Sequence, residues 1–489
     1  MIRILTLFFC VHIWVTCNSQ KQANIWYFGR HLGLDFSTAT PTLLKDGQIH
    51  EDELANAEST ATISDASGTL LFYTDGVHVW NKLQQLMPNG FGLFGSGTTT
   101  QTLIVPKPDG NLYYIFTASP EGSDDFGDYF PQANVGFHYS IIDMNLENGL
   151  GDVVEKNILL VNSTTEKIAG TFHANGKDIW VVMHEWGNDV FRSFLITANG
   201  IEPTSVVSRV GAKHGLSVNP AGAMDSEDAK GQMKLSPSGE KLALTLYQSK
   251  IVELFNFDNA VGVITEIARL SGFSEAPLYG VEFSSSSRFI YIGQVDKFVY
   301  QFDLLSENIY GSKVVLGVDF LLHDNPEQFQ LAPDGKIYIA KYDMLFIGAI
   351  DFPDKAGKEC KYEPAAIEIP VDSLRFCLSG LPNFISTYLY NPELYPPDPI
   401  FEMPDVFTPN GDDYNPSFVP IKMYNVKDIE MKIFNRWGQE VYASTDLEKA
   451  WDGGSVSAGI YYWKADYRGV NNKTYSQKGY VSLVRESVN

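Results

Sequence analysis

The sequence predicts an all-β protein, a β-propeller of about seven blades followed by a small immunoglobulin-like β-sandwich. The first observation is a short polar turn that recurs between residues 20 and 390, each time followed by an apolar, β-prone run. The second is the spacing of three of these turns, which lie 48 residues apart. The third is a change of composition after Tyr390, where a proline-rich stretch leads into a last unit of short alternating strands. A period near 50 residues with several strands per repeat is typical of a propeller.

Residues 1–19 are predicted to be a signal peptide. Arg3 is the only charged residue before Lys21, a mostly apolar run covers residues 4–15, and small residues close the segment. This order marks a secretory signal, and the run is shorter than the roughly 20 residues that a membrane span needs. A lipidated Cys17 is the alternative. Since no later run is longer, we expect no transmembrane segment.

Residues 20–390 are predicted to form the propeller, with WD40-like repeats. The turns usually end in glycine, which supplies a positive φ, and the run after each turn supplies a strand. The turns end at Gly68, Gly110, Gly176, Gly239, Ser287 and Gly335, and a further step of 48 residues leads to Asn383. Seven turns favour seven blades, with six or eight as alternatives, and a series of β-sandwich turns is the other interpretation. We expect Ile25–Phe28 to pair with the last blade and close the ring.

Residues 391–404 are predicted to be a linker, because five of the fourteen are proline. Proline fixes φ and removes an amide donor, which makes such a stretch stiff and extended. Residues 405–489 are predicted to form the separate β-sandwich, since Met431–Asn435 and Ile460–Lys464 are short alternating strands.

The formal net charge of −23 limits the partners of this chain. Binding of nucleic acid needs clustered Lys and Arg, so nucleic acid is not expected as a partner. The same charge disfavours adhesion to anionic lipid. Solubility is the simplest interpretation of the acidity.

Two cysteines are expected to form a disulfide bond in the last blade. Cys10 and Cys17 leave with the signal peptide, which leaves Cys360 and Cys377 in the mature chain. An exported chain reaches an oxidising compartment, where an even pair of cysteines usually bonds. Two buried free thiols are the alternative.

Motifs for catalysis or cofactors give little signal, so the sequence predicts no enzyme, no cofactor and no metal. Gly90–Gly95 matches GxGxxG, but a strand-like run follows it instead of the helix that a dinucleotide site needs. Four histidines in different repeats are candidate channel ligands, with scattered surface or core residues as the alternative: His173, His184, His214 and His323. Two acidic loops are candidate Ca²⁺ sites, with solvated loops as the alternative: Asp124, Asp125 and Asp128, and Asp412 and Asp413.

The last unit resembles the gliding-motility-associated C-terminal domain, the type B sorting domain of type IX secretion. The resemblance covers about Val406 to Arg485 and departs from the family pattern at Asp413 and Pro416. The motif residues that carry it are Asn410, Gly411, Asp412, Arg436, Trp437, Gly438, Trp451, Asp452, Gly453, Gly459 and Tyr461. Residues in the repeats, among them Trp26–Gly29 and Gly380–Phe384, are similar to the propeller that often precedes this domain.

The resemblance implies export through the periplasm by the type IX secretion machinery, which leaves the protein secreted or on the outer cell surface. It implies no catalytic residue. We expect Trp437 and Trp451 to fill the sandwich core, Gly438 and Gly453 to form turns, and Arg436 to pair with a carboxylate.

The sequence therefore predicts an exported binding protein whose propeller face meets an unknown protein or glycan ligand. A secreted propeller hydrolase or lyase is the alternative, because a fold does not fix a function. A structural part of the gliding or adhesion apparatus is the third possibility. Carboxylates or metal ligands that converge at the mouth of the channel would favour the enzyme.

Overall fold

The computed structural model describes residues 20–49, 58–95, 102–119, 136–215, 217–218, 224–225, 227–274, 276–295, 298–317, 326–371, 375–390, 395, 399–410, 415–446 and 450–485. Several sequence predictions lie outside these ranges: the signal peptide 1–19 with Cys17, the aspartates at 124, 125 and 128, His323, and Gly411, Asp412 and Asp413.

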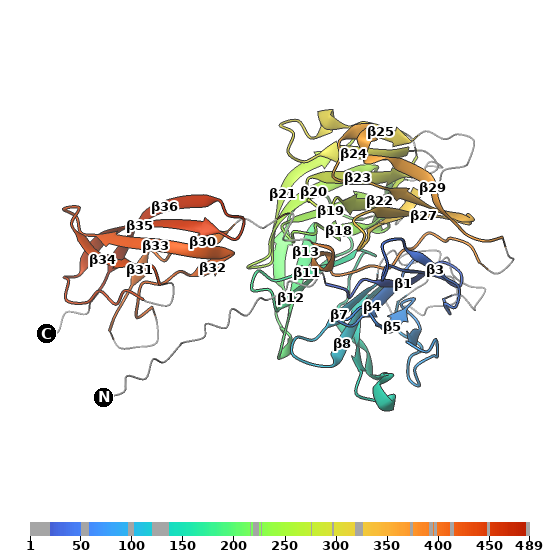
Figure 1. Cartoon of the computed structure of the whole chain (residues 1–489), viewed down its shortest axis with the longest axis horizontal. Coiled ribbons are helices and arrows are strands. Elements are labelled where there is room, and N and C mark those ends of the chain that lie inside the picture. Colours follow the sequence, from blue (N-terminus) through green and yellow to red (C-terminus); the bar gives the residue numbers. More distant parts are fainter. Residues whose placement is uncertain are drawn as a thin grey trace, which may run out of the picture.

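Strands and short 3-10 helices make up the secondary structure, and the described residues contain no α-helix. The 3-10 helices are η3 (Glu147–Gly149), η4 (Glu227–Ala229), η5 (Tyr310–Ser312), η6 (Gly357–Cys360) and η7 (Ser386–Leu389). Figure 1 shows two units, a large one formed by the first part of the chain and a small one formed by the C-terminal part.

The first three sheets of the large unit are antiparallel and follow one another in the chain. The first contains β1 (Ile25–Phe28), β2 (Leu32–Asp35) and β3 (Thr42–Leu44). The second contains β4 (Ala61–Ser64), β5 (Leu70–Thr74) and β6 (Val79–Asn81). The third contains β7 (Leu103–Pro106), β8 (Leu112–Ser119), β9 (Gly136–Asp143) and β10 (Asp152–Val161).

Four further sheets complete the large unit. The fourth contains β11 (Ile168–Phe172), β12 (Ile179–His184), β13 (Val190–Thr197), β14 (Gly200–Ile201) and β15 (Val206–Arg209). A small hairpin of β16 (Ser217–Val218) and β17 (Met224–Asp225) follows. The fifth contains β18 (Met233–Leu235), β19 (Lys241–Leu246), β20 (Ile251–Asp258) and β21 (Val263–Leu270). The sixth contains β22 (Leu278–Phe283), β23 (Phe289–Gln294), β24 (Phe298–Asp303) and β25 (Val314–Gly317), and the seventh β26 (Pro326–Leu331), β27 (Ile337–Lys341), β28 (Phe346–Ile350) and β29 (Tyr362–Glu368).

The seven sheets form the predicted propeller, and the recurring turn has one structural role in it. Each of the six turns joins the first two strands of a sheet, from the second sheet to the seventh. Gly68, Gly176, Gly239 and Gly335 have φ between 69° and 92° there, and Ser287 adopts φ 60°. Gly110 differs from this expectation, because in its turn Asp109 takes the positive φ, at 60°. The repeat predicted from the sequence is therefore the blade itself.

The ring closes between the first sheet and the chain that follows the seventh. β1 pairs with β2 in its own sheet, while Arg30 forms an antiparallel bridge with Phe376, with Arg30 N donating to Phe376 O over 3.1 Å. The Trp26 and Phe384 rings lie 5.8 Å apart. Thus β1 does not pair with a strand of the last blade, but Trp26 packs both against Tyr338 of β27 in that blade, at 5.9 Å between ring centres, and against the segment beyond it.

The predicted disulfide bond is wrong, because Cys360 and Cys377 are both free and buried. Cys360 ends η6 and packs in a core cluster with Tyr291, whereas Cys377 packs in a different cluster with Trp26. Burial raises the pKa of the Cys360 thiol to about 11 and that of the Cys377 thiol to about 12. Both therefore behave as small apolar core residues.

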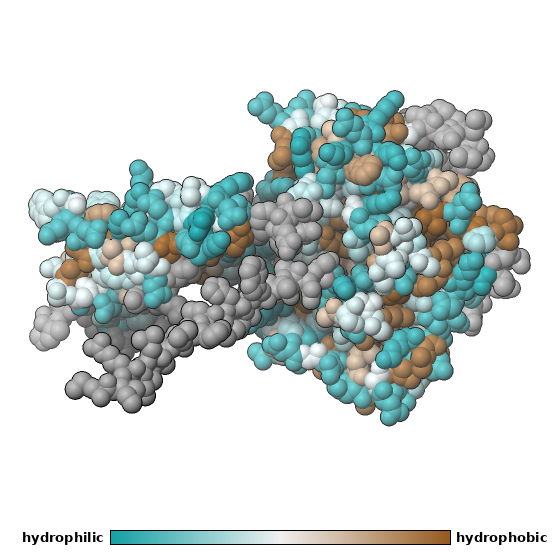
Figure 2. Space-filling view, viewed as in Figure 1, coloured by the Kyte–Doolittle hydropathy of each residue, from teal (hydrophilic) through white to brown (hydrophobic). Residues whose placement is uncertain are grey.

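The C-terminal unit is a small sandwich. A five-stranded sheet has the order β31-β36-β35-β33-β34, and β30 pairs with β32 beside it. The strands are β30 (Ile400–Glu402), β31 (Val406–Phe407), β32 (Lys422–Tyr424), β33 (Val426–Phe434), β34 (Glu440–Ser444), β35 (Gly459–Gly469) and β36 (Thr474–Leu483). Phe401 is buried in this core although it lies within 391–404. Figure 2 shows hydrophobic residues at the surface of both units among a hydrophilic majority.

The two tryptophans of the sorting motif have opposite environments. Trp451 is 4% exposed and packs against Phe407 and Tyr461, as expected. Trp437 is 82% exposed, so its predicted place in the core is wrong. Its position in the turn between β33 and β34 explains this, because the backbone N of Trp437 bonds to the Asn435 side chain and the indole points outward.

The other motif residues hold local backbone geometry. Gly438 and Gly453 have φ 77° and 79° and occupy turns, as expected. The Asp452 carboxylate accepts a hydrogen bond from Gly454 N, and the Tyr461 hydroxyl donates one to Ser457 O. Asn410 N donates to Thr408 O, and Gly459 is the first residue of β35. Arg436 stacks over the Trp437 ring at 5.7 Å and makes no ion pair with any described residue, so its expected carboxylate partner is not seen.

Candidate functional site

The centre of the propeller is occupied by the chain that follows the seventh blade. Within Ser379–Thr387, Pro382 bridges Thr60 beside β4 and Ile385 bridges Gly170 of β11, both in parallel. Gln328 N of β26 donates to Ser379 O, and Phe172 N donates to the Thr387 hydroxyl. We call Ser379–Thr387 the central segment. These contacts join it to the first strands of several blades, so it holds the inner ends of the blades together.

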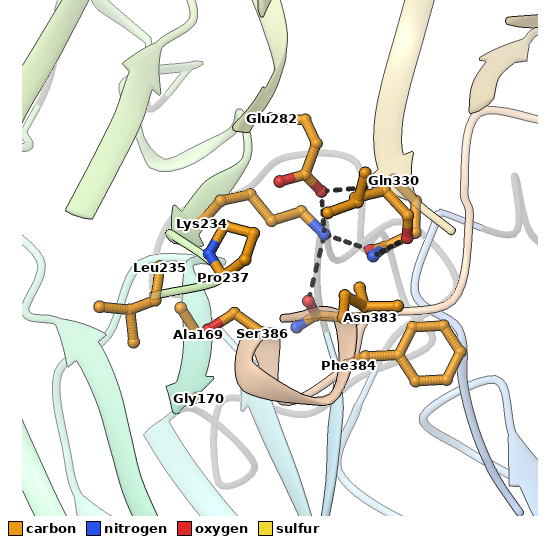
Figure 3. Close-up of a pocket in the computed structure, with 12 residues that line it drawn as sticks. Ala169, Gly170, Lys234, Leu235, Pro237, Glu282, Gln330, Asn383, Phe384 and Ser386 are labelled. Carbon is orange, nitrogen blue, oxygen red and sulfur yellow. Dashed lines mark hydrogen bonds and ion pairs between the residues drawn. The ribbon is translucent and has the colours of Figure 1, made fainter. Parts of the chain in front are cut away.

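A buried polar network surrounds this segment at the level of Asn383 (Figure 3). The Lys234 ammonium donates to Gln330 Oε1 at 2.5 Å and to Asn383 Oδ1 at 3.3 Å, and it lies 3.7 Å from Glu282 Oε2. Burial lowers the pKa of Lys234 and raises that of Glu282, while the opposite charge of each partner counters the shift. The adjoining cavity is about 10 Å³, close to the room that one water needs. The network therefore joins blades instead of binding a substrate.

A second polar group lies where the first strands of the blades begin. Glu58 precedes β4, Glu166 precedes β11, Tyr279 lies near the start of β22, and Glu327 lies near the start of β26. The Tyr279 hydroxyl bonds to a carboxylate oxygen of Glu58. Burial, with the charges of Glu166 and Glu327, raises the pKa of Glu58 well above its usual value. We call these four residues the carboxylate group.

Glu58 is the least buried member of the carboxylate group. It is half-buried, whereas Glu166, Glu327 and Tyr279 are buried. A carboxyl group with a raised pKa keeps a proton that it can donate to a ligand or a leaving group. The carboxylate group therefore offers a partly accessible proton donor backed by two acidic residues.

Lys167 stands beside this group and is fully buried. Its ammonium donates three bonds to main-chain carbonyls, those of Asp228, Ala229 and Lys230, at 3.0, 2.8 and 2.6 Å. Burial lowers its pKa to about 8, against the raising effect of Glu166 and Asp228. Lys167 thus fixes η4 against the start of β11 and supports the position of Glu166.

Two of the four candidate histidines come together. The His184 and His214 rings are stacked 3.6 Å apart, and His214 Nε2 lies 3.4 Å from Glu253 Oε2. Burial, and for His184 also the neighbouring His214, lowers both pKa values well below the usual range. His173 lies elsewhere, against Ala260 O and Trp180. In the described part of the chain, no three His, Cys, Asp or Glu side chains are arranged to hold a metal.

The glycine-rich loop has a packing role. A Cβ on Gly95 would lie 2.4 Å from Gly76 O, and Gly95 N donates to that oxygen. The next described element is the strand β7, as the sequence indicated for a loop that is not a dinucleotide site.

The carboxylate group and the Lys234 network were not predicted from the sequence, although a signal for them exists. Lys234, Glu282 and Gln330 are 48 residues apart, as are Tyr279 and Glu327. A polar residue that recurs at one repeat position inside an apolar strand marks the propeller axis, where side chains of successive blades meet.

Comparison with known proteins identifies the C-terminal unit. Residues 401–483 match the CHU_C Type IX secretion signal domain. No curated protein is significantly similar to the chain. No described helix is long and apolar enough to cross a membrane.

Solved structures have only a distant likeness to this chain. A protein suggested to be a 6-phosphogluconolactonase from Bacteroides uniformis is 13% identical, over 71% of this chain and 97% of its own, with a TM-score of 0.46. A similar protein from Bacteroides fragilis is 12% identical, over 72% and 96%, with a TM-score of 0.43. The β-propeller domain of Cps50 (Swd1) from Myceliophteria thermophila is 10% identical, over 77% and 95%, with a TM-score of 0.32.

Proposed function

We propose that this chain, whose residues 401–483 form a type IX secretion signal domain, is an exported binding protein that presents one face of its propeller to a ligand outside the cell. The signal domain directs the chain to the outer surface or the medium. In this proposal residues 1–19 direct passage to the periplasm, and the proline-rich stretch that begins at Asn391 and ends before β30 links the propeller to the signal domain.

The observation that carries the proposal is the carboxylate group, which lies at one end of a propeller whose centre is filled by protein. The central segment and the Lys234 network occupy the interior, next to a cavity of about 10 Å³. A ligand therefore meets the face, near the half-buried Glu58 and the buried Glu166 and Glu327. A protonated carboxyl beside a tyrosine and further carboxylates suits a ligand rich in hydroxyl groups or a polar protein surface.

The test is ligand binding by the purified full chain, screened against glycans and against surface proteins of neighbouring cells. For the ligand found, Glu58→Ala is expected to weaken binding by about tenfold, because the hydrogen bonds of the carboxyl group are lost. Glu363→Ala, on the last strand of the seventh blade, is the control. Equal affinity of the Glu58→Ala variant and the unchanged protein would contradict this location of the site.

A second function, hydrolysis or elimination of the bound ligand, is favoured by one specific observation. The raised pKa of Glu58 near two other carboxylates is what a general acid needs. Incubation of the bound ligand with the full chain and with the Glu58→Gln variant separates the two functions. Product that forms only with the unchanged protein supports the enzyme, and an intact ligand with both proteins supports plain binding.

A further inference from the structure

The outer face of the signal domain is arranged in bands. In the five-stranded sheet, cross-strand register aligns Phe434 with Tyr462 and Tyr462 with Tyr480. The next row on the same face aligns Lys432 with Lys464 and Lys464 with Lys478. One row is therefore aromatic and the next is basic, across the same three strands.

The aromatic row continues into exposed apolar residues at the same end of the sheet. Tyr462 and Tyr480 are 51% and 55% exposed, and Ile460, next to Tyr462 on this face, is 55% exposed. Trp437 follows Phe434 in the adjoining turn and is almost fully exposed. The inner-facing residues of β35 and β36, such as Trp463 and Val481, already fill the core. The outer apolar residues thus add nothing to that core, and a gathered apolar patch of this kind marks an interaction site.

The lysine row places three like charges next to one another across three strands. Like charges directly opposite each other on neighbouring strands are destabilising. Lys432 and Lys464 bond to Glu430 and Asp466 in the third row, at 2.7 and 2.6 Å, while Lys478 makes no ion pair with a described residue. In a chain of net charge −23, a row of three lysines stands out.

We propose that this face, consisting of Phe434, Ile460, Tyr462, Tyr480, Trp437 and the lysine row, is the surface by which the secretion machinery binds the domain. The occupant is a protein of that machinery with an apolar surface for the aromatic residues and carboxylates opposite the lysines. Exposed Tyr and Trp are the residues that most often dominate protein interfaces, and flanking charges fix orientation and speed association. This inference rests on the export part of the proposed function and is independent of the ligand of the propeller.

The test measures delivery of the full chain to the surface and medium by a bacterium that has a type IX secretion system. The Tyr462→Ser/Tyr480→Ser variant is expected to reduce delivery at least about tenfold, because aromatic hot-spot residues are lost. The melting temperature of the purified chain should stay unchanged, since neither side chain lies in the core. The matched control is Asp428→Ser/Arg468→Ser, an exposed ion pair at the far end of the same face, which should be delivered like the unchanged chain.

Two further variants keep the inference testable if the tyrosine variant unfolds. Trp437→Ser changes only an exposed turn residue, and Lys464→Glu/Lys478→Glu reverses the basic row. Both should lower delivery while thermal melts show that the signal domain is still folded. Normal delivery of either folded variant would overturn the proposal.

The alternative occupants and the signal assignment are separated by two controls. If the unchanged chain sediments as a dimer and the tyrosine variant as a monomer, with both delivered equally, the face is a self-association surface and the proposal is overturned. Deletion of residues 401–483 should abolish delivery. Normal delivery of the deletion variant would contradict the export assignment. If the deletion variant stays in the cell while the surface variants are delivered normally, only the choice of surface is wrong.

Discussion

At the scale of single residues, the buried charges near the propeller axis are the most sensitive positions. Lys234 and Glu282 come from neighbouring blades and form an ion pair, and Lys234 also donates to Gln330 and Asn383. A buried ion pair adds little net stability, because the desolvation of both charges opposes their attraction. Removal of one partner, however, leaves the other charge buried without a counter-charge.

Replacement of Lys234 by Met is therefore expected to destabilise the propeller by about 3–5 kcal/mol. The Lys234→Met/Glu282→Leu double variant should recover most of this loss, since no unpaired charge stays buried. Urea unfolding of the full chain measures both. A double variant as unstable as the single one would contradict this account of the network.

The stacked histidines give the stability a dependence on pH. Their pKa values are lowered in the folded state, so below about pH 6.5 the unfolded chain binds protons that the folded chain does not. Stability is thus fully present above this pH and is lost as the pH falls. The His184→Gln/His214→Gln variant should show a flatter stability profile between pH 7 and 5 in thermal melts, whereas His173→Gln should keep the slope of the unchanged chain. Equal slopes for the first variant and the unchanged chain would refute this role.

At the scale of elements, the sequence predicted strands and turns better than it predicted partners. The turns with a positive φ favour glycine, so they can be recognised in the sequence. By contrast, the place of Trp437 depends on which side of a tight turn faces solvent, and the separation of Cys360 from Cys377 depends on the path of the chain after β29. The residue type of Trp437 does not determine the side of the turn, and an oxidising compartment does not determine the distance between the two cysteines.

The two motif tryptophans provide a direct comparison within one small domain. Trp451→Ala should cost about 3–5 kcal/mol, because a large buried side chain leaves a cavity. Trp437→Ala should change stability by less than about 0.5 kcal/mol, as is usual for surface positions. Thermal melts of the full chain, followed at the transition of the signal domain, measure both. Similar losses for the two variants would contradict the environments described.

At the scale of the whole molecule, the chain couples a closed ring to an export domain. Closure depends on β1, Arg30 and Phe376, and the centre depends on the central segment, so the propeller is complete only when the chain extends through η7. The carboxylate group also depends on the whole ring, because its four members come from four separate blades. No local sequence motif predicts such a site, and the 48-residue spacing indicates only Tyr279 and Glu327.

Export of the propeller by its C-terminal domain is tested most directly by the location of a chain that ends after Tyr390. This chain keeps the central segment and η7, so the propeller should fold and accumulate in the periplasm. The full chain, measured in parallel by protease accessibility on intact cells and by its amount in the medium, should reach the surface or the medium. Delivery of the truncated chain at the level of the full chain would contradict the account.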